Sequence, residues 1–445
     1  MPYCKVSKYQ QDKFNEGIEI YYEQYGQGDI KVLLVIGLAG THDSWSPQIK
    51  GLTGVDILNK DASHAKDIDG NKREYSNGSL TQYPPEMQDL LVHNSGTVFP
   101  KNSIQVCSFD NRGVGQSTVP KHRSYYSTTI MARDALALLD HLGWKKAHVF
   151  GHSMGAMIAC KLAAIEPTRI SSLALLNATG GGFECFPKID RTMISIILRF
   201  LKARTPEERA DVDLDTHYTK EFLEAYIGNV KRREILYQEY VRNISKSGMQ
   251  IKHGFDGHAN ACWTHKMTPS EYEIIQTAGI HIAVIHGRDD IIAHVRHGRK
   301  IAKNLHPVAR MIELHGGHLV SHEKSEAVNQ ALIKLIEASE LNMSPQEWVN
   351  LPQHENGLEV KGVSTQYQGD KEDEIPFSTS FYSFWRHLQM MLLYFLGLFM
   401  ILWNLVKQFS ICFKKEKVEP FHAAVDAHDQ CSSRREQSSV LVSQF

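Results

Sequence analysis

The chain has 445 residues, of which 42% are hydrophobic and 22% charged, so it can bury a sizeable core and exceeds the smallest single-domain classes. Its 49 Lys and Arg balance 50 Asp and Glu, so no overall field attracts nucleic acid, and no nucleic-acid partner is expected. The seven cysteines are scattered without a C-x-x-C pair, which fits neither a disulfide framework nor a zinc site and indicates reduced thiols in a cytosolic setting.

Between about residues 18 and 340, short β-branched apolar runs alternate with longer stretches of helical pattern. This alternation predicts an α/β fold with a mostly parallel central sheet and helices on both faces. The runs before Gly37 and Gly151 are nearly continuous in apolar residues, as in central strands buried on both sides. One helix is expected at 130–142. The expected strands are 18–22, 32–36, 104–109, 147–150, 173–176, 282–285 and 310–314.

Two stretches interrupt this alternation. Residues 55–99 are polar and predict a surface or partly disordered insertion that carries no catalysis. Residues 183–273 have a helical pattern of mixed acidic, basic and aromatic residues, and predict a helical lid inserted after the sixth core strand. The catalytic core would then consist of residues 1–182 and 274–340.

The C-terminal part has a different character. A polar linker is expected at 341–380, a hydrophobic segment at 381–413 and a polar tail at 414–445. Residues 388–406 contain only three non-apolar residues and are long enough to span a bilayer, with aromatic residues before them and lysines after. The segment predicts a membrane-associated protein with a cytosolic catalytic domain. A spanning helix, an in-plane helix and a buried core helix all remain open.

The strongest local signal for chemistry is Gly151-His152-Ser153-Met154-Gly155, which follows an expected strand and precedes a helix of small residues. A serine alcohol is a weak nucleophile, so it needs a sharp strand-to-helix turn where a base reaches it and helix-terminal amides face the developing oxyanion. Glycines at 151 and 155 permit such a turn. Ser153 is therefore the candidate nucleophile.

Further motifs follow expected strands in a fixed order. Ile36-Gly37-Leu38-Ala39-Gly40 comes after the first central strand, and Asp110-Asn111-Arg112-Gly113 after the next one. Together with the serine motif they resemble the α/β-hydrolase superfamily over about residues 18–340. The resemblance implies an oxyanion hole made by the amides of Leu38 and Met154. It implies a structural role for the turn that begins at Asp110.

The acid and the base are expected later in the chain, in the order that this fold uses. His286-Gly287-Arg288-Asp289-Asp290 matches the family pattern H-G-x-x-D, which favours Asp290 over Asp289. Gly317-His318 matches the family's G-H after the last strand, which favours His318 over His315. Each match alone could be an ordinary loop pair or a surface histidine. Three matches in order predict a catalytic triad of Ser153, Asp290 and His318.

Five histidines lie close together in the sequence, which is one feature of metal sites. No H-E-x-x-H occurs, and the H-x-x-H pattern has no accompanying carboxylate of the usual kind, so no metal and no cofactor are expected. Solvated or capping histidines are the simpler interpretation. The five are His294, His297, His315, His318 and His322.

The sequence thus predicts a serine hydrolase that cleaves a carboxylic ester or lactone. The expected substrate is a small molecule, and a lipidic one remains open. Within the superfamily, the loop at 37–45 resembles that of enol-lactonases and small carboxylesterases, and Ser153 argues against branches with a carboxylate nucleophile. The whole chain also resembles plant α/β-hydrolases of undefined substrate with a C-terminal membrane segment. Two other uses of the fold remain open: a receptor-like ligand binder and a membrane scaffold.

Overall fold

The computed structural model describes residues 2–6, 17–56, 103–188, 190–247, 250–351, 353–355 and 358–360. By its internal contacts the chain divides into two units, 1–364 and 365–445, and every described residue belongs to the first. The predicted polar insertion at 55–99 lies almost entirely outside the described residues. The predicted membrane segment and polar tail lie wholly outside them.

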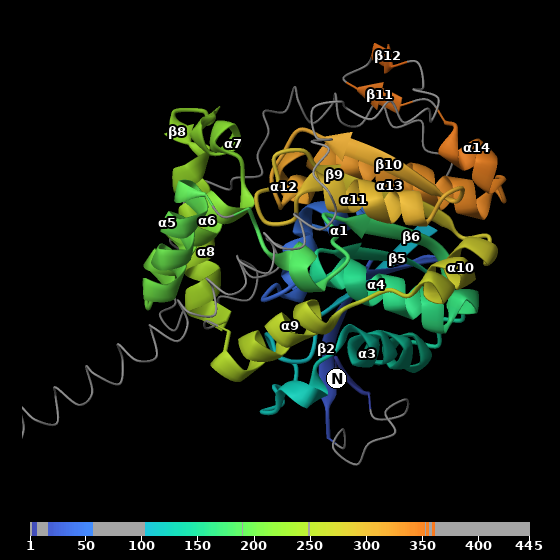
Figure 1. The fold of residues 1–445 in the computed structure, drawn as a ribbon, viewed down its shortest axis with the longest axis horizontal. Helices are drawn as coiled ribbons and strands as arrows, with labels where there is room; N and C mark the ends of the chain where they lie inside the picture. Colours follow the sequence, from blue (N-terminus) through green and yellow to red (C-terminus); the bar gives the residue numbers. More distant parts are fainter. Residues whose placement is uncertain are drawn as a thin grey trace, which may run out of the picture. The chain divides into compact units, whose positions relative to one another are not determined.

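An eight-stranded sheet forms the centre of the first unit, with strand order β1-β2-β4-β3-β5-β6-β9-β10 (Figure 1). β1 and β2 are antiparallel to their neighbours, and the pairs from β4 to β10 are parallel. The strands are β1 (Tyr3–Lys5), β2 (Glu19–Tyr25), β3 (Ile30–Val35), β4 (Ile104–Phe109), β5 (Ala147–His152), β6 (Ile170–Leu176), β9 (His281–Gly287) and β10 (Ala309–Leu314). The mostly parallel sheet and the seven strands predicted within it are confirmed, and within this sheet the short β1 was not predicted.

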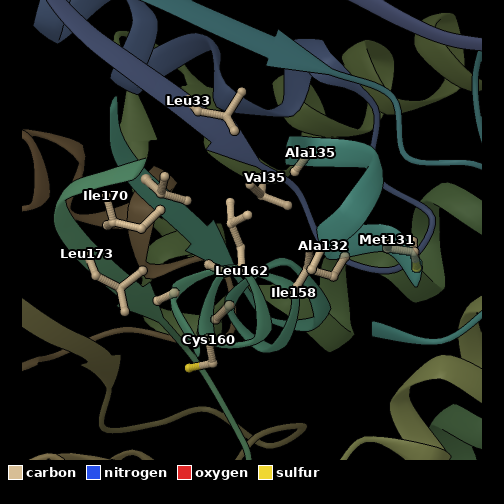
Figure 2. Close-up of a cluster of buried hydrophobic side chains, with 14 of the residues drawn as sticks. Leu33, Val35, Met131, Ala132, Ala135, Ile158, Cys160, Leu162, Ile170 and Leu173 are labelled. Carbon is tan, nitrogen blue, oxygen red and sulfur yellow. The ribbon is translucent and has the colours of Figure 1, made fainter. Parts of the chain in front are cut away.

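Helices cover both faces of this sheet, because alternate residues of each buried strand point to opposite sides. In β3, Leu33 and Val35 contribute to one core, whereas Val32 and Leu34 contribute to the other. Figure 2 shows the first core, where Leu33 and Val35 face side chains of α3 and α4. The second core contains side chains of α1 and α13. The helices of the core are α1 (Ser46–Thr53), α3 (Thr128–His141), α4 (Met154–Ile165), α11 (Val295–Asn304), α12 (Val320–Glu323), α13 (Ser325–Glu340) and α14 (Pro345–Val349).

A helical insertion, residues 182–277, separates β6 from β9 at the position predicted for a lid. Helices α5 to α8 lie together (Figure 1), and α9 returns toward α3 and α4. Its elements are η9 (Gly182–Cys185), α5 (Arg191–Lys202), α6 (Pro206–His217), α7 (Lys220–Glu224), β7 (Tyr226–Ile227), β8 (Val230–Lys231), α8 (Arg232–Ser247), α9 (Lys252–Thr264) and α10 (Pro269–Thr277). Among the described residues, no helix is long and apolar enough to cross a bilayer.

The structure corrects the expected start of the polar linker at 341. α14 lies inside that range, and its Trp348 is buried in the second core, where its Nε1–H donates a hydrogen bond to the carbonyl of Ile282 (2.9 Å). The sequence pattern missed this helix because it has a single large apolar anchor rather than a repeated apolar stripe. The folded core therefore continues to about residue 350, and a chain cut at Glu340 would lose part of it.

Trp348→Ala should lower the free energy of unfolding by about 3–5 kcal/mol, because it removes a fully buried indole and leaves a cavity. Chemical denaturation monitored by circular dichroism measures the change. Trp263, which is 42% exposed, offers a matched control, and Trp263→Ala should cost clearly less. Equal effects of the two substitutions would mean that α14 does not contribute to the core.

Candidate active site

Ser153 lies on the turn between β5 and α4, with φ 54° and ψ −119°. A residue with a Cβ rarely adopts a positive φ, so close packing must hold this turn. Gly151 and Gly155 provide that packing, since a Cβ on Gly155 would lie 2.0 Å from the carbonyl oxygen of Val35 and one on Gly151 would lie 2.4 Å from that of Gly155. The two glycines of the serine motif thus let the helix approach the sheet and expose the Ser153 hydroxyl at the strand end.

The three residues predicted as a triad lie in one hydrogen-bonded line. His318 Nε2 is 3.1 Å from Ser153 Oγ, and His318 Nδ1 is 2.8 Å from Asp290 Oδ2. The serine comes from the turn after β5, the aspartate from the turn after β9 and the histidine from the loop after β10. Because parallel strands end at the same edge of a sheet, residues far apart in the chain meet there.

Asp290 is held as a carboxylate. Its Oδ1 accepts hydrogen bonds from the amides of Ile292 and Ala293, both at 2.8 Å, and its Oδ2 accepts one from Asn177 Nδ2 at 2.7 Å. Burial alone would raise the pKa of Asp290, but the charge and hydrogen bond of His318, the nearby His286 and the hydrogen bond from Asn177 outweigh it and lower the pKa to about 2. The group is therefore anionic and acts only as an acceptor toward His318.

The neighbouring candidates are placed differently. Asp289 and His315 are partly exposed and pair with each other, with 2.7 Å between Oδ2 and Nδ1. His315 Nε2 lies 2.9 Å from Glu221 of α7, and the two carboxylates raise the pKa of His315. This group links the helical insertion to the loop that carries His318 and does not contact Ser153 or His318.

Two residues that support the triad were not recognised from the sequence. Asn177, which has φ 47° after β6, binds Asp290 and the carbonyl of Gly317 (3.3 Å). Its position directly after a parallel strand was an available signal. His152, within the serine motif, donates its Nε2–H to the carbonyl of His318 (2.8 Å), and burial with the nearby charge of His318 lowers the pKa of His152 to about 3. His152 therefore stays neutral and fixes the backbone of His318.

The loop predicted for one half of the oxyanion hole lies against the serine. A Cβ on Gly37 would lie 3.0 Å from both Ser153 Cβ and the carbonyl oxygen of His152, so a side chain here would force the serine turn to shift. Leu38 follows, and Ala39 has a left-handed backbone with φ 63°. Met154 is the first residue of α4, so its amide has no partner within the helix. Leu38 thus follows a glycine packed against Ser153, and Met154 is the residue directly after the serine.

The turn that begins at Asp110 is structural, as its motif implied. Asp110 is fully buried and accepts hydrogen bonds from the amides of His42 (2.7 Å) and Gln116 (2.9 Å). Arg112 forms a buried bidentate ion pair with Asp134, with both contacts at 2.6 Å. These contacts connect the strand ends next to the site without reaching Ser153.

The remaining clustered histidines have other partners. His294 caps α11 by accepting from the amide of Arg296 (3.3 Å), His297 lies 3.3 Å from Glu184, and His322 Nε2 lies 2.8 Å from the carbonyl of Ser44. In the part of the chain that the structure describes, no group of three or more His, Cys, Asp or Glu side chains could hold a metal ion.

Buried neutral histidines make the fold sensitive to acid. Burial lowers the pKa of His152 and of His265 to about 3 and that of His258 to about 4, from 6.5 in an unfolded chain. The unfolded chain therefore binds more protons between pH 6.5 and 4, so stability should be full above pH 6.5 and fall as the pH drops through this window. Each histidine can contribute up to about 1.4 kcal/mol per pH unit.

Urea denaturation at pH 7, 6 and 5 measures this loss above the range in which ordinary carboxylates titrate. His42 does not mask the effect: burial opposes its charge, but hydrogen bonds to Asp110 and Glu23 raise its pKa to about 10, so its contribution is constant below pH 6.5 and is lost only at alkaline pH. A denaturation midpoint that does not change from pH 7 to 5 would contradict the neutral state of the three histidines.

The sequence matches the family model described as alpha/beta hydrolase fold over residues 78–325, which is more than half of the chain. It is 28% identical over 230 residues to the non-heme bromoperoxidase BpoC of Mycobacterium tuberculosis, covering 51% of this chain and 80% of that protein. It is 32% identical over 101 residues to the carbamate hydrolase RutD of Variovorax paradoxus, covering 23% and 34%. The crystal structure of the enol-lactonase from Burkholderia xenovorans LB400 superimposes with a TM-score of 0.51 at 22% identity, over 72% of this chain and 98% of that one.

Proposed function

Since this chain belongs to the α/β-hydrolase fold family and is a hydrolase, we propose that it cleaves a carboxylic ester or a lactone through an acyl-enzyme on Ser153. The observation that carries the proposal is the line from Ser153 Oγ through the His318 ring to Asp290, with distances of 3.1 and 2.8 Å. A base within hydrogen-bond reach of a nucleophile, itself oriented by a buried carboxylate, is the arrangement needed for acyl transfer.

The reaction would proceed in two halves. Ser153 Oγ attacks the carbonyl carbon while His318 Nε2 takes its proton, and the amides of Leu38 and Met154 stabilise the oxyanion. Collapse of this intermediate breaks the bond to the alcohol oxygen, which receives the proton from His318. A water activated by His318 then hydrolyses the acyl-serine. With a lactone the alcohol stays attached to the acyl group throughout, and the second step releases a single hydroxy acid.

Asp290 would hold His318 in the tautomer with the proton on Nδ1 and offset the charge of the imidazolium. Its low pKa supports this role, because a carboxylate that stays ionised throughout the reaction does not compete for the proton. Asn177 and the amides of Ile292 and Ala293 would fix its orientation. With three further hydrogen-bond donors, the Asp290 carboxylate can rotate little, so its hydrogen bond to His318 keeps one geometry.

The helical insertion would act as the lid that selects the substrate. Its α6–α7 link lies against the His318 loop: Leu319 N donates to the carbonyl of His217 (3.0 Å), and Glu323 accepts from the amides of both Thr219 (2.8 Å) and Gly317 (2.9 Å). The ring of His217 lies 5.9 Å from that of His318. Residues of the insertion thus stand beside the catalytic histidine, where they would contact a bound acyl or alcohol group.

An ester or lactone substrate is supported by the chemistry of the named relatives. An enol-lactonase and a carbamate hydrolase both act at a carbonyl group bonded to oxygen or nitrogen, by the names they carry. A serine nucleophile, a histidine base and two backbone amides suffice to hydrolyse such a substrate without a cofactor. The membrane segment expected at 388–406 lies outside the described residues, and membrane association, including access to lipidic esters, stays a prediction.

The proposal is tested by reacting the protein with a fluorophosphonate probe and by measuring turnover of p-nitrophenyl esters of increasing acyl length beside a simple lactone. Covalent labelling of Ser153 with multiple turnovers per chain would support the hydrolase. Labelling with a single binding event and no turnover would favour a receptor-like use of the same residues. No labelling and no hydrolysis of any ester or lactone would overturn the proposal.

A further inference from the structure

His258 of α9 lies at a junction between the helical insertion and two loops of the core. It is fully buried, and its Nε2 is 2.7 Å from the carbonyl oxygen of Arg112. A carbonyl can only accept, so Nε2 carries the proton and Nδ1 has a free lone pair. Burial lowers the pKa of His258 to about 4, which keeps the ring neutral and Nδ1 an acceptor at physiological pH.

The lone pair on Nδ1 faces the loop beside the catalytic serine. The amide of Ala39 donates to it over 3.4 Å, and Gln250 Nε2 lies 3.3 Å from the same atom. Gln250 also donates to the carbonyl of Gly113 (2.9 Å), so it too joins the insertion to the turn after β4. Among the described residues, the hydrogen bond from Ala39 to His258 connects the insertion to the loop at residues 37–40.

Ala39 needs such a contact. Its φ of 63° is a left-handed conformation, which costs a residue with a Cβ about 1–2 kcal/mol. On its other side, Gly37 is in close contact with the backbone of His152 and with Ser153. Leu38 therefore lies between two fixed points: Gly37 against the serine turn and the Ala39 amide against His258.

We propose that His258 is a positioning residue, which holds the loop at residues 37–40 so that the Leu38 amide faces the oxyanion. The inference rests on the proposed serine-hydrolase function. His258 does not touch the substrate. Its hydrogen bond to the Ala39 amide sets the peptide plane next to Leu38, and α9 thereby becomes part of the support of the oxyanion hole.

A simpler alternative is that His258 only satisfies the buried carbonyl of Arg112. Two substitutions separate the roles, because the side-chain amides of Asn and Gln reach different positions of the imidazole. In His258→Asn, the amide oxygen can replace Nδ1 as the acceptor for Ala39, while the bond to Arg112 is lost. In His258→Gln, the amide nitrogen can replace Nε2 as the donor to Arg112, while the acceptor for Ala39 is lost.

The test is the kinetics of these variants in the full chain with a p-nitrophenyl ester that the wild type hydrolyses. We expect His258→Gln to lower kcat about ten- to a hundredfold with KM changed less than about threefold, since complete loss of an oxyanion donor costs about a hundred- to a thousandfold. His258→Asn should keep most of kcat although it is less stable. The rate of labelling by the fluorophosphonate should follow kcat. His265→Gln, at another buried histidine of this region, provides the matched control and should leave kcat near the wild-type value.

If His258→Gln does not fold, replacing Ala39 with lactic acid by nonsense suppression removes only the amide donor and should lower kcat to a similar extent. Wild-type kcat in His258→Gln, or in the variant with lactic acid at position 39, would overturn the role of His258. A wild-type protein that neither hydrolyses esters nor reacts with the probe would instead overturn the proposed function. The two failures are therefore distinguishable.

Discussion

Ser153→Ala should reduce kcat/KM for ester hydrolysis by about ten-thousand-fold or more, because the reaction loses the atom that forms the acyl-enzyme. The fold should remain intact. The Ser153 hydroxyl contacts only His318 Nε2 among the described residues, while the turn is held by backbone contacts such as Ser153 N to the carbonyl of Leu176 (2.8 Å). Residual activity above background would come from the oxyanion hole and from substrate binding alone.

The measurement is the hydrolysis of a p-nitrophenyl ester by wild type and variant, with fluorophosphonate labelling in parallel. Ser44→Ala offers a control with the same chemical change, since the Ser44 hydroxyl accepts from the amide of Thr41 (3.3 Å) in a nearby turn outside the triad. We expect that variant to stay within about tenfold of the wild type. More than a tenth of wild-type activity in Ser153→Ala would show that another residue is the nucleophile.

Asp290→Asn and His318→Ala should each lower kcat by about a thousandfold or more, whereas Asp289→Asn and His315→Ala should each cost less than about tenfold. An asparagine at 290 would place an amide NH₂ either toward the amides of Ile292 and Ala293, which donate as well, or toward His318 Nδ1. In the second orientation it would hold the imidazole with the proton on Nε2, so that the ring could no longer accept the serine proton.

The neighbouring pair supplies the matched controls. Asp289 and His315 carry the same functional groups as Asp290 and His318 but are exposed, and the ion pairs of His315 with Asp289 and Glu221 are exposed enough to contribute little. The kinetics of all four variants on one ester, with denaturation curves to verify folding, decide the assignment. Similar losses within either pair would contradict the choice made from motif spacing.

The strands and the candidate catalytic residues could be predicted because both depend on patterns in neighbouring residues. The glycines around Ser153 and the apolar runs before each motif are short-range signals, so the strands and the candidate residues at their ends could be identified in order. His258 and Asn177 could not be assigned roles in this way. Their partners lie 146 and 113 residues away, and only the folded chain shows which carbonyl or carboxylate each one meets.

Trp348 illustrates the same limit for the fold. A single tryptophan in a short polar segment gives no periodic signal, and its burial depends on the space left between β9, β10 and α13. Boundaries drawn from composition therefore placed the end of the core about ten residues too early. The short edge strand β1 was missed for a related reason, because three residues cannot display a pattern.

The hydrogen bonds between the α6–α7 link and the His318 loop have a consequence for substrate exchange. Glu323 binds Thr219 and Gly317 at once, and His217 binds Leu319, so any displacement of this link would also shift the backbone on either side of His318. An opening of the insertion at this point would therefore also move His318 away from Ser153 and Asp290. If the insertion is the proposed lid, substrate and product exchange that leaves the triad intact would use a different side of the insertion, while the α6–α7 link stays in place.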